Sequence, residues 1–205
     1  MLTKVYSKAP AQRHIDQIVQ VLKEDGMVIL PTDSVYCFAV SAHSKLGRER
    51  LAALKGKPVE KANLSFMLAD LTALGTYAKK VSNPVYALMN RLLPGPFTFI
   101  LHASTEVEKM MPGRKTIGIR VADHKIPAQI ISELGHPLLT MSVHHEDEIL
   151  AYATDPEEIY RLFADRADLI VDGGYGHNEA STILDCTGNE VVMIRQGIGE
   201  LEEVN

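Results

Sequence analysis

The sequence predicts an α/β fold in a single domain over residues 1–205. Apolar segments of strand length alternate along the chain with amphipathic segments in which apolar residues recur at helical spacing. The order of the last three strand segments departs from the regular alternation of strands and helices, which indicates a mixed sheet with parallel and antiparallel pairs. No internal repeat, low-complexity tract or linker divides the chain.

The first helix and strand are predicted from their ends as well as from their periodicity. Apolar residues recur at helical spacing ahead of Gly26, which closes the helix. The apolar run at 27–30 is typical of a strand, and Pro31 ends it because proline cannot donate to a strand ladder. A second apolar run covers 36–40, after a short polar stretch.

Ser44 is predicted to cap the second helix, with Leu46, Leu51 and Leu54 facing inward and Lys55 near its C-terminal end. The remaining predicted helices run, in order, from Asp70 to Leu74, over 83–93, over 126–134 and over 155–163. The remaining predicted strands are 64–68, 97–101, 116–121, 137–143, 168–172, 181–185 and 191–195.

Caps and breakers support the later helices. The sequence PGP at 94–96 stops the helix that precedes it, and Gly135 closes the next one. The helix at 155–163 has an aspartate cap, proline at its first position and acidic residues in its first turn. These signals give the helix at 155–163 the best-defined start in the chain.

The distribution of charge indicates one region that binds anions. A net charge of −5 argues against a protein that coats nucleic acid indiscriminately. Basic side chains are concentrated at 45–61 and 109–125, whereas 146–168 is acidic. Solvated lysines scattered over the surface are the alternative interpretation of the same charges.

The chain has the features expected of a cytoplasmic protein without a membrane segment. No apolar run approaches the roughly 20 residues that span a bilayer, and the N-terminal residues lack a signal-peptide core. Cys37 and Cys186 have no paired metal or redox spacing, so reduced thiols are expected. Cys37 is flanked by apolar residues, which favours a packing role over a nucleophilic one.

Several common site motifs are absent. Gly56-Lys57 is followed by proline, so no Walker A loop forms, and neither G-x-G-x-x-G nor G-x-S-x-G occurs. His145-Glu146 lacks the second histidine of H-E-x-x-H. The run HHEDE at 144–148 has two interpretations, a metal site or a solvated loop, and the solvated loop is favoured.

Polar side chains gather at the ends of predicted strands, where α/β proteins collect their ligands. They are Thr32, Ser34, Lys55, Lys57, Arg120, Ser142, His144, Ser181, Thr182 and Arg195. At each single position an ordinary turn residue or a solvated cation is the alternative. Together, the hydroxyls and cations point to a polyanionic small molecule, which makes a nucleotide plausible without a phosphate loop.

Motifs in order along the chain resemble those of the YrdC/YciO family of threonylcarbamoyl-adenylate synthases. They are LPTDSVYCFAV, LKGKP, PGPFTFIL, TIGIRVADH, LLTMSVHHED, STILD and IRQGIG. The resemblance extends from about Ile15 to Gly199, and the segment NLSFML makes the YciO branch the better match.

The resemblance implies a twisted mixed sheet flanked by helices, with a large concave basic cavity. It implies a reaction in which L-threonine, bicarbonate and ATP, with Mg²⁺, give threonylcarbamoyl-adenylate and pyrophosphate for modification of a tRNA adenosine. It also implies binding of double-stranded RNA through the same concavity.

Site residues follow from the resemblance by position. Catalytic roles fall on Lys55, Lys57, Ser142 and His144. ATP binding falls on Lys57, Lys61, Thr116, Ser142 and Arg195. Threonine binding falls on Thr32, Ser34, Arg120, Thr140 and Ser181, with Arg120 pairing the substrate carboxylate. Thr32 and Ser34 are expected to line the substrate pocket, and the resemblance implies no metal-binding side chain.

Three positions depart from the family pattern. Lys57 replaces an arginine and loses its planar fork of donors. His144 replaces an asparagine, and Cys37 replaces a glycine beside Tyr36. Two hypotheses follow: an enzyme that makes an amino-acid carbamoyl-adenylate, and a cavity-bearing protein that binds RNA or nucleotides with little or no synthase turnover.

Overall fold

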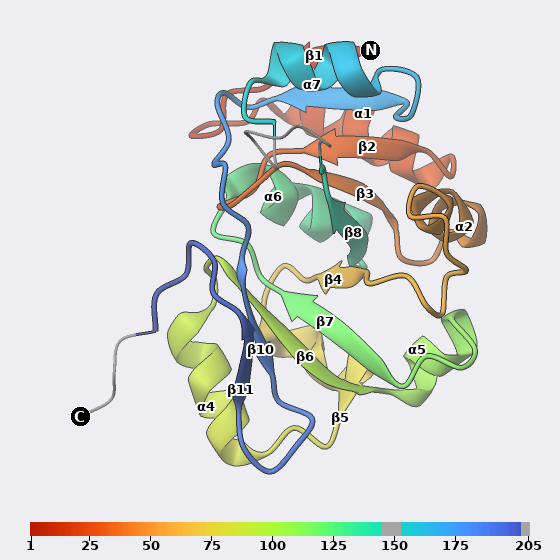
Figure 1. The fold of residues 1–205 in the computed structure, drawn as a ribbon. Helices are drawn as coiled ribbons and strands as arrows, with labels where there is room; N and C mark the ends of the chain where they lie inside the picture. Colours follow the sequence, from red (N-terminus) through yellow and green to blue (C-terminus); the bar gives the residue numbers. More distant parts are fainter. Residues whose placement is uncertain (145–152, 202–205) are drawn as a thin grey trace.

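A mixed sheet of eleven strands organises the computed structural model, which describes residues 1–144 and 153–201 (Figure 1). The order across the sheet is β1-β9-β2-β3-β8-β4-β7-β6-β10-β11, and β5 pairs with β6 outside this path. The strands are β1 (Leu2–Lys4), β2 (Met27–Leu30), β3 (Cys37–Ser41), β4 (Ser65–Met67), β5 (Ala78–Lys79), β6 (Phe97–Ala103), β7 (Thr116–Arg120), β8 (Leu138–Ser142), β9 (Leu169–Asp172), β10 (Thr182–Asp185) and β11 (Val192–Arg195).

Parallel and antiparallel pairs both occur, which confirms the mixed sheet. Strand β9 pairs in parallel with β1 and β2, and β7 and β10 pair in parallel with β4 and β6 respectively. The β2–β3, β3–β8, β4–β8, β6–β7, β5–β6 and β10–β11 pairs are antiparallel. The sequence analysis does not predict β1 and β5, because segments of three and two residues carry too little periodicity.

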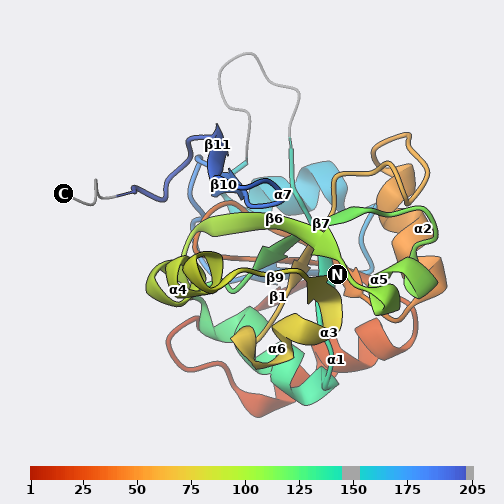
Figure 2. The same ribbon diagram turned by 90° about the horizontal axis from the view of Figure 1, so that it is seen from below.

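Helices cover both faces of the sheet. They are α1 (Gln12–Lys23), α2 (Lys45–Ala53), α3 (Leu74–Tyr77), α4 (Asn83–Leu92), α5 (Thr105–Met110), α6 (Lys125–Leu134) and α7 (Pro156–Phe163). Figure 2 shows α1 and α6 on the face opposite to β10, β11 and α7. Successive side chains of a strand point to opposite faces, so Val28 and Leu30 of β2 join the core beneath α1 and α6, whereas Met27 and Ile29 join the core on the other face.

The inward face of α2 differs from the prediction. Leu51 is fully buried, but Leu46 and Leu54 are 53% and 36% exposed. Arg48 is buried instead, and its Nη1 donates to the Ala42 carbonyl at 2.6 Å. Helix α2 is thus rotated about its axis relative to the prediction, and Gly47 explains why. A Cβ at Gly47 would lie 3.0 Å from the Val40 side chain, so the helix packs against the sheet through its smallest residue.

The helix predicted at Asp70 continues beyond Leu74. The Asp70 carboxylate accepts from Thr72 N at 2.8 Å and caps a 3₁₀ turn over Leu71–Ala73, which runs on into α3. Helix α5 is absent from the sequence prediction, although Ser104 caps it by accepting from Val107 N. Among the described residues, no helix has the length and apolarity that crossing a bilayer requires.

Candidate functional site

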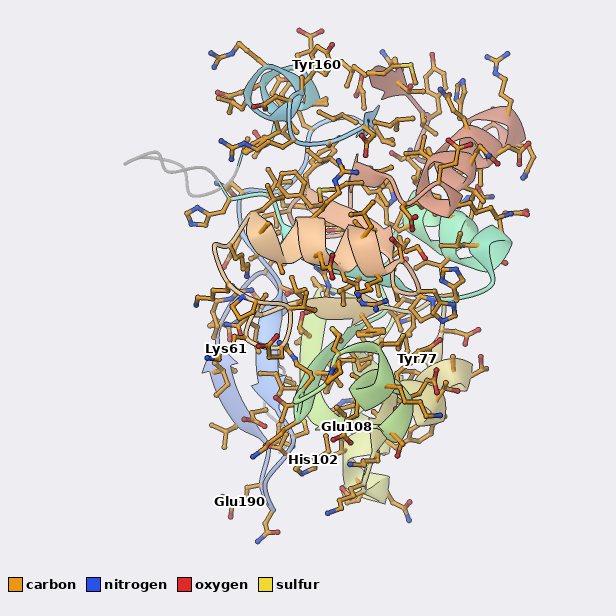
Figure 3. The ribbon with its side chains drawn as sticks, turned by 90° about the vertical axis from the view of Figure 1, so that its right-hand side faces the viewer. Lys61, Tyr77, His102, Glu108, Tyr160 and Glu190 are labelled. Carbon is orange, nitrogen blue, oxygen red and sulfur yellow. The ribbon has the colours of Figure 1, made fainter. Side chains whose placement is uncertain are left out.

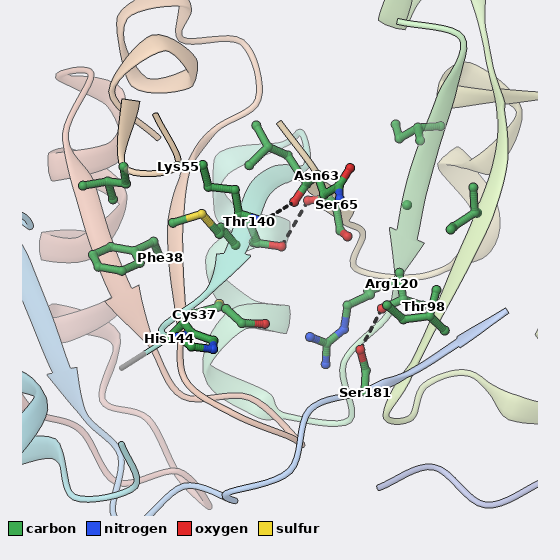
Figure 4. A pocket seen from close by; sticks show the side chains of 18 of the residues that line it. Cys37, Phe38, Lys55, Asn63, Ser65, Thr98, Arg120, Thr140, His144 and Ser181 are labelled. Carbon is green, nitrogen blue, oxygen red and sulfur yellow. Dashed lines mark hydrogen bonds between the residues drawn. The ribbon is translucent and has the colours of Figure 1, made fainter. Parts of the chain in front are cut away.

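A cavity of about 850 Å³ opens between two groups of strands. Cys37 and Phe38 of β3 lie on one wall, and Thr98 of β6 and Arg120 of β7 lie on the other, across an open space in Figure 4. Further lining residues come from β4, β8, β10, β11, α7 and the loop between α2 and β4. The cavity therefore collects side chains that are far apart along the chain.

Gly118 allows the strands on one wall to pack closely. A Cβ at Gly118 would lie 2.5 Å from Ser65 Oγ and 3.1 Å from Thr98 Cγ2, which is too close for ordinary contact. All three residues line the cavity. Ser65 of β4 is also held to the neighbouring strand β8, since its carbonyl accepts from Thr140 Oγ1 at 3.0 Å.

The described lining carries positive charge and no carboxylate side chain. Its cations are Lys55, Arg114, Arg120, Arg166 and Arg195. Partial burial, followed by the charges of Lys57, Arg114 and Arg195, lowers the pKa of the Lys55 ammonium. Cations gathered in this way without acids on the same wall form an attractive site for a polyanion.

Arg120 is the one lining cation that a buried carboxylate neutralises within residues 1–144 and 153–201. Its Nη2 donates to Asp33 Oδ1 at 2.9 Å and to Ser34 Oγ at 3.0 Å. The side chains of Arg120 and Asp33 are only 6% and 9% exposed. Nε of Arg120 is buried and has no acceptor in the described part of the chain, so the guanidinium keeps donor capacity for a ligand.

The turn between β2 and β3 places Asp33 and Ser34 behind Arg120. Thr32 Oγ1 donates to the Val35 carbonyl at 2.7 Å and accepts from Ser34 N at 3.1 Å. Thr32 and Ser34 are buried, and neither lines the cavity. The expectation that they line it is corrected for a physical reason: their hydroxyls hold the turn and orient Arg120.

Hydroxyl groups stand beside Arg120 on the same wall. Thr98 Oγ1 and Ser181 Oγ lie 2.9 Å apart, and both residues are buried (Figure 4). The Ser181 carbonyl accepts from Arg195 Nη2 at 2.7 Å, which fixes the cation of β11 near the start of β10. This wall can therefore hold a carboxylate and a hydroxyl group close to one another.

Eight of the twelve site residues inferred from the resemblance line the cavity: Lys55, Thr116, Arg120, Thr140, Ser142, His144, Ser181 and Arg195. Thr32 and Ser34 lie behind Arg120, as described above. Lys57 and Lys61 are exposed on the loop after α2 and do not line the cavity; Figure 3 shows Lys61 at the surface. The catalytic and binding roles of all twelve stay predictions.

The sequence analysis assigns no role to five polar lining residues: Asn63, Ser65, Thr98, Arg114 and Arg166. Arg114 falls within the basic segment 109–125, so the charge distribution contained a signal for it. Arg166, stacked 5.5 Å from the centre of the Phe163 ring, falls within the acidic segment 146–168, where no such signal exists. Thr98 belongs to the motif PGPFTFIL.

Metal and nucleophile chemistry have little support in the described residues. Within 1–144 and 153–201, no group of three or more His, Cys, Asp or Glu side chains could hold a metal ion. Of the run HHEDE, only His144 lies within the described residues. Burial raises the pKa of the Cys37 thiol to about 12, so Cys37 stays protonated and acts as a packing residue.

Comparisons with known proteins agree with this architecture. YciO of Escherichia coli, an uncharacterized protein, is 33% identical over 97% of this chain and 96% of its own, and its crystal structure matches with a TM-score of 0.89 over 98% and 97% of the two chains. Threonylcarbamoyl-AMP synthase of Vibrio vulnificus is 27% identical over 90% of this chain and 98% of its own. The structure of P. abyssi Sua5 complexed with L-threonine matches with a TM-score of 0.85 at 24% identity, over 96% of this chain and 57% of Sua5.

A protein-family model agrees with these relatives. The model of Sua5, YciO and YrdC proteins, described by the words "Telomere recombination", matches residues 20–197. This match and the identity to YciO confirm the resemblance seen in the motifs. The chain belongs to the Sua5/YciO/YrdC family.

Proposed function

We propose that the chain is a nucleotidyltransferase of the threonylcarbamoyl-AMP synthase type. It joins L-threonine, bicarbonate and ATP into threonylcarbamoyl-adenylate and pyrophosphate, in the cytoplasm, for modification of a tRNA adenosine. The observation that carries the proposal is the cavity itself, with five cations, no carboxylate among its described lining residues, and hydroxyls buried beside Arg120. The Vibrio vulnificus relative and the P. abyssi Sua5 complex support the amino acid and the reaction type.

The two substrates occupy different parts of the cavity in this proposal. The threonine carboxylate pairs with Arg120, whose Nε has no acceptor among the described residues, and Ser181 and Thr140 of the same cavity contact the rest of the amino acid. The ATP phosphates lie against Lys55 and Arg195, with Thr116 and Ser142 as further contacts. Ser34 acts through Arg120 as a positioning residue.

The chemistry needs charge neutralisation and alignment rather than a covalent enzyme intermediate. The threonine amine takes up bicarbonate as a carbamate, with release of water. A carbamate oxygen then attacks the α-phosphorus of ATP, and the bond from that phosphorus to the bridging oxygen breaks, which releases pyrophosphate. Two anions must approach each other, so fixed cations such as Lys55, Arg120 and Arg195 supply the main favourable interaction.

The described cavity residues do not form a protein site for Mg²⁺. Magnesium prefers oxygen ligands and is commonly held by carboxylates together with substrate phosphates. The lining residues within 1–144 and 153–201 contribute hydroxyls and cations but no carboxylate. We therefore infer that Mg²⁺ enters as part of the nucleotide substrate, held by phosphate oxygens.

Pyrophosphate release tests the proposed function directly. We expect release only when ATP, bicarbonate and L-threonine are present together, and none when any one of them is omitted. His144→Asn restores the residue that the family pattern has there, and we expect it to preserve or raise the rate. Release that is independent of threonine would contradict the proposal, as would its absence under all conditions.

Lys55 gives the proposed ATP site a characteristic pH dependence. Its pKa is lowered in the free protein, and a bound triphosphate raises it by stabilising the ammonium. Above the lowered pKa, ATP binding must therefore take up a proton, and affinity falls as the pH rises. Below the lowered pKa, Lys55 is already protonated in the free protein, and no such uptake occurs.

Calorimetric titration with ATP in two buffers of different ionisation enthalpy measures this proton uptake. Wild-type protein should take up protons at alkaline pH, and Lys55→Gln should not. Lys45→Gln is the matched control, because Lys45 is 83% exposed and its ion-pair partner, Glu49, is also exposed. Equal uptake in wild type and Lys55→Gln would exclude Lys55 as the coupled group.

A second candidate function is binding of RNA with little or no synthase turnover. The observation that favours it is the exposure of Lys57 and Lys61 outside the cavity, where they are free to contact a large anion. Binding that weakens steeply with salt, without pyrophosphate release, would support this candidate because phosphate contacts displace counterions.

A further inference from the structure

Arg114 is a lining cation to which the family resemblance assigns no role. It precedes β7 and follows a tight turn in which its own N donates to the Met111 carbonyl at 3.1 Å. Its Nε donates to the Thr116 carbonyl at 2.8 Å, and its Nη1 donates to the carbonyls of Glu60 and Ala62. Three backbone carbonyls thus fix the plane and direction of the guanidinium.

Those contacts leave the charge of Arg114 without a neutralising partner. All three acceptors are carbonyls, and within 1–144 and 153–201 no carboxylate forms an ion pair with Arg114. Its Nη2 donates to no protein acceptor in the same ranges, and the side chain lines the cavity. Burial also lowers the pKa of Arg114, as expected for a cation held away from water without a counter-charge.

Two cavity cations, Lys55 within the loop between α2 and β4 and Arg114 outside it, bind adjacent carbonyls of that loop. Lys55 Nζ donates to the Asn63 carbonyl at 2.9 Å, while Arg114 binds Ala62 next to it. The loop is therefore closed on itself by Lys55 and fastened to the segment before β7 by Arg114. Lys57, where the family pattern has arginine, lies on this loop, is exposed and does not line the cavity.

We infer that Arg114 is a triphosphate-binding residue of this cavity, with Nη2 as the donor to a phosphate oxygen and Nε and Nη1 as the anchors that aim it. This inference rests on the proposed function for the identity of the nucleotide. A guanidinium supplies the planar set of donors that Lys57 lacks, so the segment that precedes β7, rather than the α2–β4 loop, provides the arginine. The prediction concerns the phosphates only, not the adenosine or the threonine.

The test is a series of affinities for AMP, ADP, ATP and inorganic tripolyphosphate, measured by calorimetry on the full chain with Mg²⁺. In wild-type protein we expect affinity to rise with each added phosphate. Arg114→Gln should weaken ATP and tripolyphosphate by about ten- to a hundred-fold, the effect of losing one charged hydrogen bond, and should leave AMP nearly unchanged. Arg114→Lys should lie between the two.

Controls separate this role from a merely structural one. Arg161→Gln removes the same charge from an exposed residue whose partner is Glu158, and it should leave the series unchanged. If Arg114 only fastened the loop, Arg114→Gln would weaken all four ligands equally and keep the rise with phosphate number. That result would overturn the inference, as would a wild-type protein that binds no tripolyphosphate.

The series also distinguishes this inference from the proposed function. Suppose that tripolyphosphate binds the wild-type protein but not Arg114→Gln, and that no threonine-dependent pyrophosphate release is found. This result would support the phosphate-binding role of Arg114 and contradict the synthase activity. In the opposite result, pyrophosphate release depends on threonine, and Arg114→Gln changes neither its rate nor the KM for ATP. That result would support the synthase and exclude Arg114 as a phosphate-binding residue.

Discussion

Arg120→Ala is expected to lower the free energy of unfolding by about 3–5 kcal/mol and to abolish threonine-dependent pyrophosphate release. The substitution leaves the Asp33 carboxylate buried without its cation, and it removes a donor to Ser34 Oγ. An unpaired buried charge costs far more than the pair contributes, which is why the loss is large. Chemical unfolding followed by circular dichroism measures the stability, and the three-substrate assay measures the activity.

Arg50→Ala is the matched control for this prediction. Arg50 also pairs with an aspartate, Asp168, at 2.8 Å, but the two side chains are 35% and 46% exposed. Water solvates the remaining carboxylate, so we expect a loss of about 1 kcal/mol or less. Equal losses in the two variants would show that burial does not govern the Arg120–Asp33 pair. Arg120→Lys keeps a cation beside Asp33 and should retain more stability while still losing turnover.

Gly197→Ala is expected to destabilise the protein by about 1–3 kcal/mol and to reduce pyrophosphate release strongly. A Cβ at Gly197 would collide with the Ala180 carbonyl and would lie 2.6 Å and 2.7 Å from the carbonyl carbon and oxygen of Ser181. These are backbone atoms, which cannot rotate away. The same Ser181 carbonyl accepts from Arg195, so relief of the clash displaces both site residues.

Gly188→Ala is the control for Gly197→Ala. The nearest atom to a Cβ at Gly188 is the Glu190 carbonyl at 3.8 Å, which is ordinary contact. We expect a change in stability within about 0.5 kcal/mol and unchanged turnover. Wild-type stability in Gly197→Ala would contradict the close packing of the segment after β11 against the residues just before β10.

The fold could be predicted from the sequence wherever a local signal was strong. The Asp155 cap and Pro156 predict the start of α7, and Gly135 predicts the end of α6. In the structure Gly135 has a φ of 76°, the left-handed conformation that glycine favours. The inward face of α2 could not be predicted from hydrophobicity alone. Its packing depends on how closely Gly47 approaches β3, a tertiary contact that no periodicity within the helix expresses.

The candidate site was predictable as a set of residue types but not as a geometry. Motif positions identify Arg120 and Ser181, and both line the cavity. They do not reveal that Ser34 acts from behind Arg120, because that depends on the turn held by Thr32. Arg114 is anchored by carbonyls about fifty residues away in the chain, a relation that only the folded chain creates.

Strand β9 has a consequence for how the protein is made. It lies between β1 and β2 and pairs with both in parallel, so the two N-terminal strands meet only through residues 169–172. While the ribosome is still synthesising the middle of the chain, β2 keeps one open edge and β1 has no partner strand. This half of the sheet can therefore be completed only after β9 has been synthesised, and until then β2 presents an open apolar edge to which other chains can attach.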